Sequence, residues 1–166
     1  MKCICGEPLK KQKKDYHYTE SGLDNVILSG INVFECSECG EIFPEIIGIN
    51  ELHKQIGLAL VKKRSQLKGK EIRFIRKLLG FNEKKFASIM GVDPVSVSRW
   101  ENSKADVGMT SDKLIRMLFI QSLEEECNKV ARDAVGLISS LRKKVELEKP
   151  IKIPLLKGSF CLSLSK

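Results

Sequence analysis

The chain has 166 residues and a net charge of +8, and 42% of its residues are hydrophobic, which is enough for one medium-sized domain or two small ones. The charge is uneven: residues 1–50 carry 5 basic and 8 acidic side chains, whereas residues 51–70 carry 6 and 1. This pattern favours a nucleic-acid partner for the later part of the chain and a different partner for the first part. No apolar run has the length of a signal peptide or a membrane span, so we expect a cytoplasmic protein without membrane association.

Four of the six cysteines form two tight pairs that lie far apart in the sequence. Cys3 and Cys5 are separated by one residue and Cys36 and Cys39 by two, and a glycine follows each pair. Two such turns that face each other supply four thiolates to one tetrahedral Zn²⁺, so we predict all four cysteines as ligands of one structural Zn²⁺ per chain. Because the first pair is one residue shorter than usual, His17 is the alternative ligand.

The sequence around the cysteines predicts a small antiparallel sheet. Runs of β-branched and aromatic residues predict strands at residues 16–18, 25–28, 31–35 and 41–44. Ser29-Gly30 is expected to break the second strand from the third, and the lysine-rich stretch at residues 10–14 indicates a loop or a strand edge. About fifty residues cannot bury a sufficient core, so the metal would replace the missing apolar contacts.

Helical patterns dominate after residue 48. Leu52, Ile56 and Leu60 repeat at helical spacing after Asn50, a plausible N-cap, in a helix that becomes basic at residues 62–64. We predict four further short helices: one that ends at Gly80, one at 83–90 after Asn82, one at 94–100 after Asp93, and one that begins after Thr110 or Ser111. The helical pattern continues from residue 121 to about 145, and Pro150 and Pro154 indicate an irregular tail.

The predicted fold class is therefore α+β with two domains. We expect a small β-rich zinc-binding domain at residues 1–50, a helical basic linker at 51–69, an all-α helix-turn-helix domain at 70–120, and a helical extension and tail at 121–166. The linker is either a helical arm or a hinge. His53 is expected on the surface and Cys127 in an apolar environment, whereas Cys161 lies in the tail and carries no spacing signal.

Residues 83–101 fit a helix-turn-helix. Ala87 is small where two helices would cross, and Gly91 allows a left-handed turn between them. The start of the second helix then faces outward, as the part that enters the major groove of DNA. Arg99 is the predicted base contact, because a guanidinium can bridge guanine O6 and N7; a phosphate contact or an ion pair with Glu101 is the alternative. The other predicted DNA contacts are Ser96 with a base or a phosphate, Val95 with a thymine methyl group, and Lys84, Lys85, Ser98 and Lys104 with phosphates.

The order of the two modules resembles the MqsA-type antitoxins, in which a YgiT-type zinc finger precedes a Cro/C1-type helix-turn-helix. Residues 33–41 resemble their second zinc knuckle, and residues 98–102 resemble the end of their recognition helix. The resemblance extends to about residue 120. It implies a homodimer that binds a double-stranded DNA operator and represses its own operon, and a zinc-bearing half that binds an mRNA-cleaving toxin. The family has asparagine where this chain has Val95 and glutamine where it has Glu83, so a different operator sequence is expected.

The combined prediction is a transcriptional repressor that serves as the antitoxin of a type II toxin–antitoxin pair. One alternative is a stand-alone zinc-containing helix-turn-helix transcription factor with no toxin partner. Another is an RNA-binding zinc protein that stacks bases on Tyr16, Tyr18 and Phe34. Four thiolates leave no open position on the metal, and the sequence contains no nucleophile–base pair or phosphate-binding glycine loop, so no enzymatic activity is expected.

Overall fold

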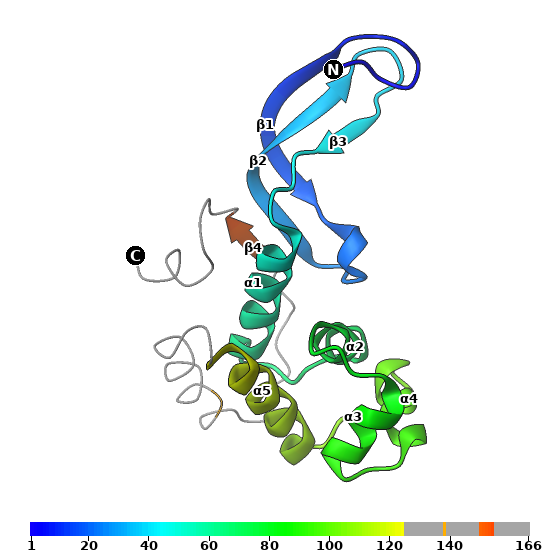
Figure 1. The fold of residues 1–166 in the computed structure, drawn as a ribbon, viewed down its shortest axis with the longest axis vertical. Coiled ribbons are helices and arrows are strands. Elements are labelled where there is room, and N and C mark those ends of the chain that lie inside the picture. The colour runs from blue at the N-terminus through cyan, green and yellow to red at the C-terminus, as the bar shows by residue number, and fades with distance from the viewer. Residues whose placement is uncertain (125–137, 139–149, 155–166) are drawn as a thin grey trace.

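In a computed structural model, the chain forms an elongated molecule with a β-sheet at one end and a group of helices at the other (Figure 1). The structure describes residues 1–124, 138 and 150–154. A sheet followed by five helices confirms the predicted mixed α+β class. The elements in chain order are β1 (Leu9–His17), a 3-10 turn (Thr19–Ser21), β2 (Val26–Cys36), β3 (Ile42–Pro44), α1 (Ile49–Lys62), α2 (Gly69–Leu78), α3 (Glu83–Met90), α4 (Pro94–Glu101), α5 (Met109–Glu124) and β4 (Ile151–Pro154).

The sheet is built on β2, which is longer than the sequence predicted. It pairs antiparallel with β1 from Leu9↔Cys36 to His17↔Ile27, so the lysine-rich stretch lies on an edge strand. The predicted break at Ser29-Gly30 is wrong. Gly30 has a φ of 64° and donates its N–H to Asp15 Oδ1 at 2.9 Å, where the pairing register shifts. A β-bulge thus absorbs the irregular residues while the strand continues.

The tail contributes a fourth strand to this sheet, so the prediction of an irregular segment there is wrong for residues 151–154. β4 pairs parallel with β2 from Val26↔Ile151 to Ser29↔Pro154, and Ile153 is buried. β1 pairs with one edge of β2. β3 and β4 therefore both pair with the opposite edge, β3 with residues 33–35 and β4 with residues 26–29. Prolines are compatible with such a short strand at its ends. Cys127 and Cys161 lie outside the described residues.

One hydrophobic core runs from the sheet through α1 into the other helices. Leu28 of β2, Ile56 of α1 and Ile75 of α2 are all completely or almost completely buried in it. The helix starts differ slightly from the predictions: α1 begins at Ile49 after Gly48, so Asn50 is not its cap, and α5 begins at Met109. The predicted division into domains at residues 50, 69 and 120 stays a prediction. No helix in the described residues is long and apolar enough to cross a membrane.

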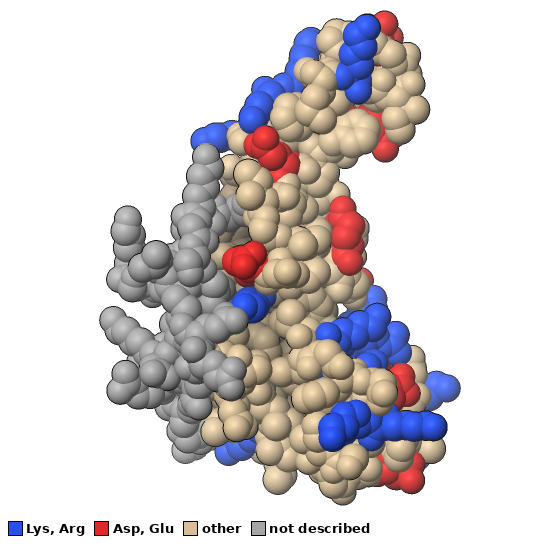
Figure 2. All heavy atoms as spheres, viewed as in Figure 1, with Lys and Arg blue, Asp and Glu red and all other residues tan. Residues whose placement is uncertain are grey.

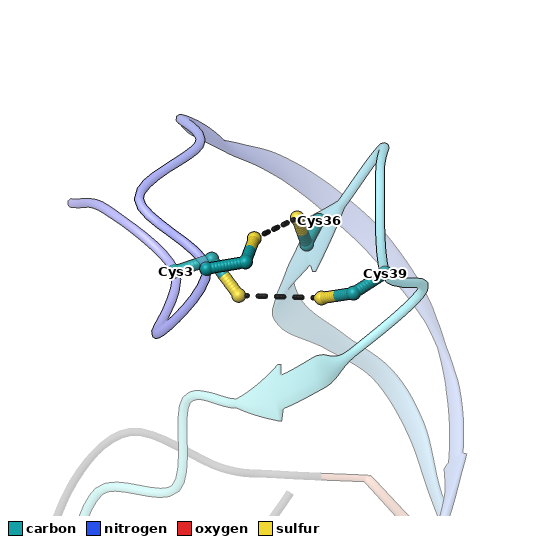
Figure 3. A group of neighbouring side chains, drawn as sticks. Cys3, Cys36 and Cys39 are labelled. Atoms are coloured by element: carbon teal, nitrogen blue, oxygen red, sulfur yellow. Dashed lines mark hydrogen bonds between the residues drawn. The ribbon is translucent and has the colours of Figure 1, made fainter.

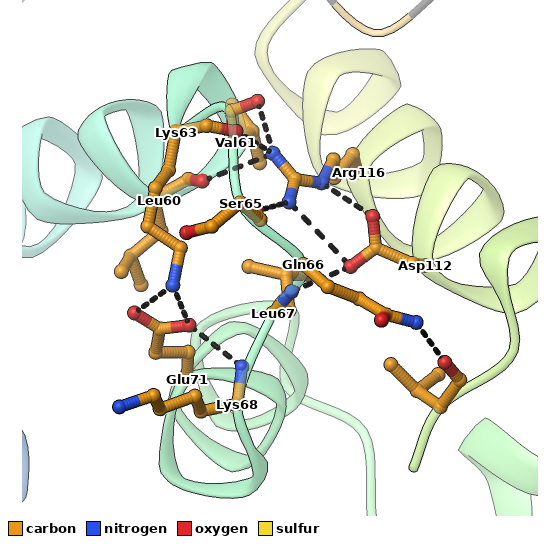
Figure 4. Close-up of polar contacts among 11 residues, drawn as sticks. Leu60, Val61, Lys63, Ser65, Gln66, Leu67, Lys68, Glu71, Asp112 and Arg116 are labelled. Carbon is orange, nitrogen blue, oxygen red and sulfur yellow. Dashed lines mark hydrogen bonds and ion pairs between the residues drawn. The ribbon is translucent and has the colours of Figure 1, made fainter. Parts of the chain in front are cut away.

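A buried arginine fixes the segment between α1 and α2 (Figure 4). Arg116 of α5 is completely buried, and its Nε donates to Asp112 Oδ2 at 2.9 Å. Asp112 Oδ1 in turn accepts the Leu67 N–H at 2.8 Å. The Arg116 guanidinium also donates to carbonyl oxygens at the end of α1 and just beyond it, those of Val61 (2.9 Å), Lys63 (2.6 Å) and Ser65 (2.7 Å). It therefore binds carbonyl groups that the end of a helix leaves without partners.

The sheet meets the helices at a cluster of three rings. Tyr18 is buried, and its hydroxyl lies 2.9 Å from His53 Nε2 of α1. The His53 ring packs edge-on against Phe74 of α2, with 5.6 Å between ring centroids. His53 is half-buried and not fully on the surface as expected, because this face of α1 turns toward the sheet and α2. The cluster connects the cysteine-bearing half of the molecule to the helical half.

The burial of His53 predicts a pH dependence of stability. Burial lowers the pKa of His53 below its ordinary value of 6.5. The unfolded chain therefore takes up a proton near pH 6.5 that the folded chain still excludes, and the free energy of unfolding falls as the pH drops below that value. Urea unfolding of wild type and His53→Gln at pH 7.5 and 5.5 measures this effect, since glutamine does not titrate. The wild type should lose more stability than the variant; an equal loss would contradict the prediction.

Candidate metal centre and nucleic-acid interface

The four cysteines of the two predicted pairs meet at the tip of the sheet (Figure 3). The sulfurs of Cys3, Cys5, Cys36 and Cys39 all lie within 4.8 Å of one another. Two of the separations join the two loops, with 3.4 Å between Cys3 Sγ and Cys39 Sγ and 3.5 Å between Cys5 Sγ and Cys36 Sγ. In a tetrahedral site with Zn–S bonds of about 2.3 Å, the sulfurs are about 3.8 Å apart. The cluster could therefore hold one four-coordinate metal ion.

Both cysteine loops are tight turns, including the short one. The Gly6 N–H donates to the Cys3 carbonyl at 2.9 Å, and the Gly40 N–H donates to the Cys36 carbonyl at 3.1 Å. Gly6 and Gly40 have φ angles of 95° and 70°, in the left-handed region that glycine adopts most easily. The glycine after each pair thus lets both loops close. The shorter first loop still presents its two sulfurs to different sulfurs of the second loop.

His17 is not part of the cysteine cluster. It lies eight residues beyond Leu9, which pairs with Cys36, so about 26 Å of β-strand separates it from the cysteines. Its Nε2 atom lies 2.7 Å from the carbonyl oxygen of Asp24. The geometry therefore gives no support to His17 as the alternative ligand.

The surroundings of the four sulfurs stabilise a thiolate at one cysteine and disfavour further thiolates beside it. Backbone N–H groups of Cys39 and Glu38 lower the pKa of Cys36 to about 7. At Cys39, a backbone hydrogen bond from Glu41 favours the thiolate, but the sulfurs of Cys3 and Cys36 outweigh it and raise the pKa to about 12. Close negative charges oppose one another, and a bound divalent cation reverses that effect.

The helix pair α3–α4 begins and ends where the sequence predicts, within one residue. The Asn82 side chain accepts the Lys85 N–H at 2.8 Å, and the Asp93 side chain accepts the Val95 N–H at 2.7 Å, which confirms both predicted N-caps. Gly91 ends α3 with a φ of 65°. The three-residue turn between the helices thus follows from local side-chain chemistry.

The position of α4 is fixed by a close approach and by ion pairs to the buried Glu101. A Cβ atom on Gly69 would lie 2.4 Å from the Trp100 carbonyl oxygen, so only glycine allows α2 to start this near to the end of α4. Glu101 is buried and accepts hydrogen bonds from Arg76 Nε at 2.5 Å and Arg73 Nε at 3.0 Å. Burial raises the pKa of Glu101, but these two arginines outweigh it and hold the pKa below its usual value.

The sequence did not predict this positioning role of Arg73 and Arg76, because partners so far apart in the chain leave no local spacing signal. An ion pair between Arg99 and Glu101 was the predicted alternative to a base contact. That alternative is wrong, since both Glu101 oxygens face α2. Trp100 is buried, which confirms its expected place in the core.

The predicted DNA contacts lie on one end of the molecule with different exposures. Val95 is 63% exposed, and Arg99 is exposed and forms no ion pair with any described residue. Lys84, Lys85 and Lys104 are exposed as well, whereas Ser96 and Ser98 are half-buried. Figure 2 shows Lys and Arg side chains gathered around the end formed by α2, α3 and α4. The structure thus leaves the start of α4 and its flanking lysines accessible to a partner.

Residues 1–127 match the family model described as the antitoxin component of a bacterial toxin–antitoxin system, MqsA. The chain belongs to the MqsA antitoxin family. The match spans the cysteine cluster and the elements from β1 to α5, and it ends before β4. Searches of curated proteins and of solved structures gave no match.

Family membership implies a toxin partner, and the tip of the sheet carries exposed charges of both signs, with Lys2 and Lys10 beside the cysteine loops. Glu7, Glu38 and Glu41 lie next to the cysteines in the sequence and are exposed. In contrast, Lys11 pairs with Glu45 at 3.2 Å and Lys14 pairs with Glu35 at 2.6 Å, so two lysines of β1 are partly neutralised. Four thiolates around a divalent cation would add a further net charge of about −2 to the tip.

Proposed function

We propose that this protein is the antitoxin of a type II toxin–antitoxin pair and represses its own operon. Its cysteine-bearing half binds the toxin, and its α3–α4 surface binds a double-stranded operator as a homodimer. Membership of the MqsA family over residues 1–127 is the observation that carries the proposal. Arg99, which is exposed and forms no ion pair within the described residues, and the accessible lysines Lys84, Lys85 and Lys104 support the DNA-binding part.

The proposed metal is one structural Zn²⁺ held by the four cysteines. Thiolates are soft ligands that suit zinc and not magnesium or calcium. Four protein ligands close the coordination sphere, so the ion supplies folding energy to the tip and no reactive position. The role of this half is then to present a surface to the toxin. The acidic side chains Glu7, Glu38 and Glu41 would attract a basic toxin.

In the DNA-binding role, Arg99 contacts a base and the lysines contact phosphates. A guanidinium that bridges guanine O6 and N7 contributes about 1–3 kcal/mol of discrimination against other bases. Three exposed lysines flank Arg99 in the sequence: Lys84 and Lys85 at the start of α3, and Lys104 after α4. Phosphate contacts hold the protein in register but do not distinguish sequences.

Arg99→Ala should remove operator specificity without loss of the fold. We expect the preference for the operator over unrelated DNA to fall roughly 5- to 150-fold, in line with the loss of about 1–3 kcal/mol. Fluorescence anisotropy with the protein's own promoter fragment and a scrambled duplex measures this ratio. Lys104→Ala is the matched control, because loss of a phosphate contact should weaken binding to both duplexes equally. An unchanged ratio for Arg99→Ala would contradict the assigned role.

The proposed toxin partner is tested by expression of the reading frame next to this gene. Its expression alone should arrest growth, co-expression with this protein should restore growth, and the two proteins should co-purify. If the neighbouring product is harmless while the operator is bound, the protein is the stand-alone transcription factor of the alternative hypothesis.

A further inference from the structure

The last described strand of the sheet lies outside the region that the family model matches. The match ends at residue 127, whereas β4 spans Ile151–Pro154. Its side chains alternate between the interior and solvent: Ile153 is 5% exposed and Ile151 is half-buried, whereas Lys152 and Pro154 are exposed. Such alternation is typical of a strand with one buried face, so this segment of the chain packs into the core.

β4 contacts both the sheet and α1. The Ile151 N–H donates to the Asn25 carbonyl at 2.7 Å, and the pairing with β2 is parallel. Of the described strands, β4 has the most extensive approach to α1, and Figure 1 shows it beside the start of that helix. Ile153 belongs to the same hydrophobic core as Ile56 of α1. β4 therefore packs at the junction between the sheet and the helices.

A second set of contacts lies on the side of the junction that faces α2. The Tyr18 hydroxyl lies 2.9 Å from His53 Nε2, and the His53 ring packs against Phe74 of α2. Lys70 of α2 pairs with Asp24 at 2.6 Å, but both side chains are mostly exposed, and such ion pairs contribute little. In the view of Figure 1, α2 and β4 lie on opposite sides of α1. The junction is thus held from two sides, and β4 supplies one of them.

Two prolines and a lysine restrict β4 to this position. Pro150 precedes the strand and Pro154 ends it, and proline has no N–H with which to extend a ladder. The exposed Lys152 lies between them. Prolines and lysines on an edge strand oppose pairing with another chain. β4 therefore covers residues 26–29 of β2 and is poorly suited to receive a further strand.

We propose that residues 150–154 form a strap that fixes the orientation of the cysteine-bearing sheet relative to the helical half. With β4 in place, the sheet and the helices move as one body. When β4 is displaced, the sheet reorients about the ring cluster of Tyr18, His53 and Phe74. The strap thereby holds the cysteine cluster and the α3–α4 surface, at the two ends of the molecule, in one relative orientation (Figure 1). The inference concerns the free protein and does not depend on the proposed toxin or operator.

Ile153→Asp should release the strap, because it places a charge where an isoleucine is buried. NMR relaxation of backbone amides in the full-length protein measures how each half tumbles. In the wild type, the amides of β2 and α4 should give one rotational correlation time. In the variant, the amides of β2 should give a shorter time than those of α4. Lys152→Ser is the matched control, because Lys152 belongs to the same strand but is exposed, and it should behave as the wild type does.

Hydrogen exchange at Ile27 verifies that the strand has been displaced. The Val26 carbonyl accepts the Tyr18 N–H on the side of β1, whereas the Asn25 carbonyl accepts the Ile151 N–H on the side of β4. Successive residues of a strand direct their backbone groups to alternate neighbours, so the Ile27 amide faces β4. Its exchange should accelerate roughly tenfold or more in Ile153→Asp, since the lost burial of one isoleucine corresponds to at least that factor in local opening.

A second variant, Ile151→Ser with Ile153→Ser, removes both apolar side chains without adding a charge and should give the same result. Two correlation times in both variants, with one in the wild type and in Lys152→Ser, would confirm the strap. A single correlation time in both variants would overturn it even if exchange at Ile27 accelerates, because other contacts would then hold the sheet. Loss of the dispersed amide signals of α3 and α4 in both variants would also overturn it, since β4 would then be required for the whole fold.

Discussion

Cys36→Ser should release the proposed Zn²⁺ and disorder the tip of the sheet. Cys36 is buried, lies 3.5 Å from Cys5 Sγ and belongs to the strand that pairs with both β1 and β3. A structural Zn²⁺ contributes about 10–16 kcal/mol in zinc-finger peptides, far more than the few apolar contacts of the tip can replace. We expect elemental analysis to find one zinc per wild-type chain and almost none in the variant.

The structure also predicts where this disorder should stop. Val26 and Leu28, at the other end of β2, are completely buried in the core shared with α1, and β4 pairs with them. Hydrogen exchange in Cys36→Ser should therefore accelerate in both cysteine loops and in β3, but much less at Val26 and Leu28. Ile4→Ser is a matched control, because Ile4 lies in the first loop and is 92% exposed. Wild-type protein without metal after growth in zinc-replete medium would refute the prediction.

The parts of the molecule that the sequence predicted well have short-range causes. Asn82 and Asp93 cap helices within three residues of themselves, and Gly91 ends α3 through its own backbone conformation. The cysteine pairs belong to the same group. Each pair forms a local turn, and because a tetrahedral metal site needs four thiolates, the sequence also predicts that the two turns lie together.

The parts that it missed depend on contacts between distant segments. Nothing near Ile153 indicates that it is buried against β2, because four residues that end in a proline resemble a tail until the partner strand is known. The helical pattern likewise predicts His53 as a polar surface residue, and only its contacts with Tyr18 and Phe74, which come from other segments, make it half-buried. Long-range pairings of this kind leave no periodic signal in a single sequence.

Arg116→Met should destabilise the protein more than other substitutions of one polar residue. Methionine has a similar length, but it leaves the Asp112 carboxylate buried without its cation and the carbonyl groups at the end of α1 without a donor. Removal of one partner from a buried ion pair typically costs about 3–5 kcal/mol. Urea unfolding measures this loss. Arg99→Met is the matched control, because Arg99 is exposed and has no ion pair in the described chain, so its effect should stay within about 0.5 kcal/mol.

A second substitution distinguishes the buried charge from the missing hydrogen bonds. Asp112→Asn with Arg116→Met removes the uncompensated carboxylate but keeps an oxygen that can accept the Leu67 N–H. The double variant should therefore be more stable than Arg116→Met alone, and it should remain less stable than wild type, because the carbonyls of Val61, Lys63 and Ser65 still lack their donor. If the stability loss of the double variant equalled the sum of the losses of the two single variants, the lost ion pair would not explain the destabilisation by Arg116→Met. If Arg116→Met cost less than about 1 kcal/mol, water would have to replace the guanidinium, and the segment between α1 and α2 would not depend on α5 for its position.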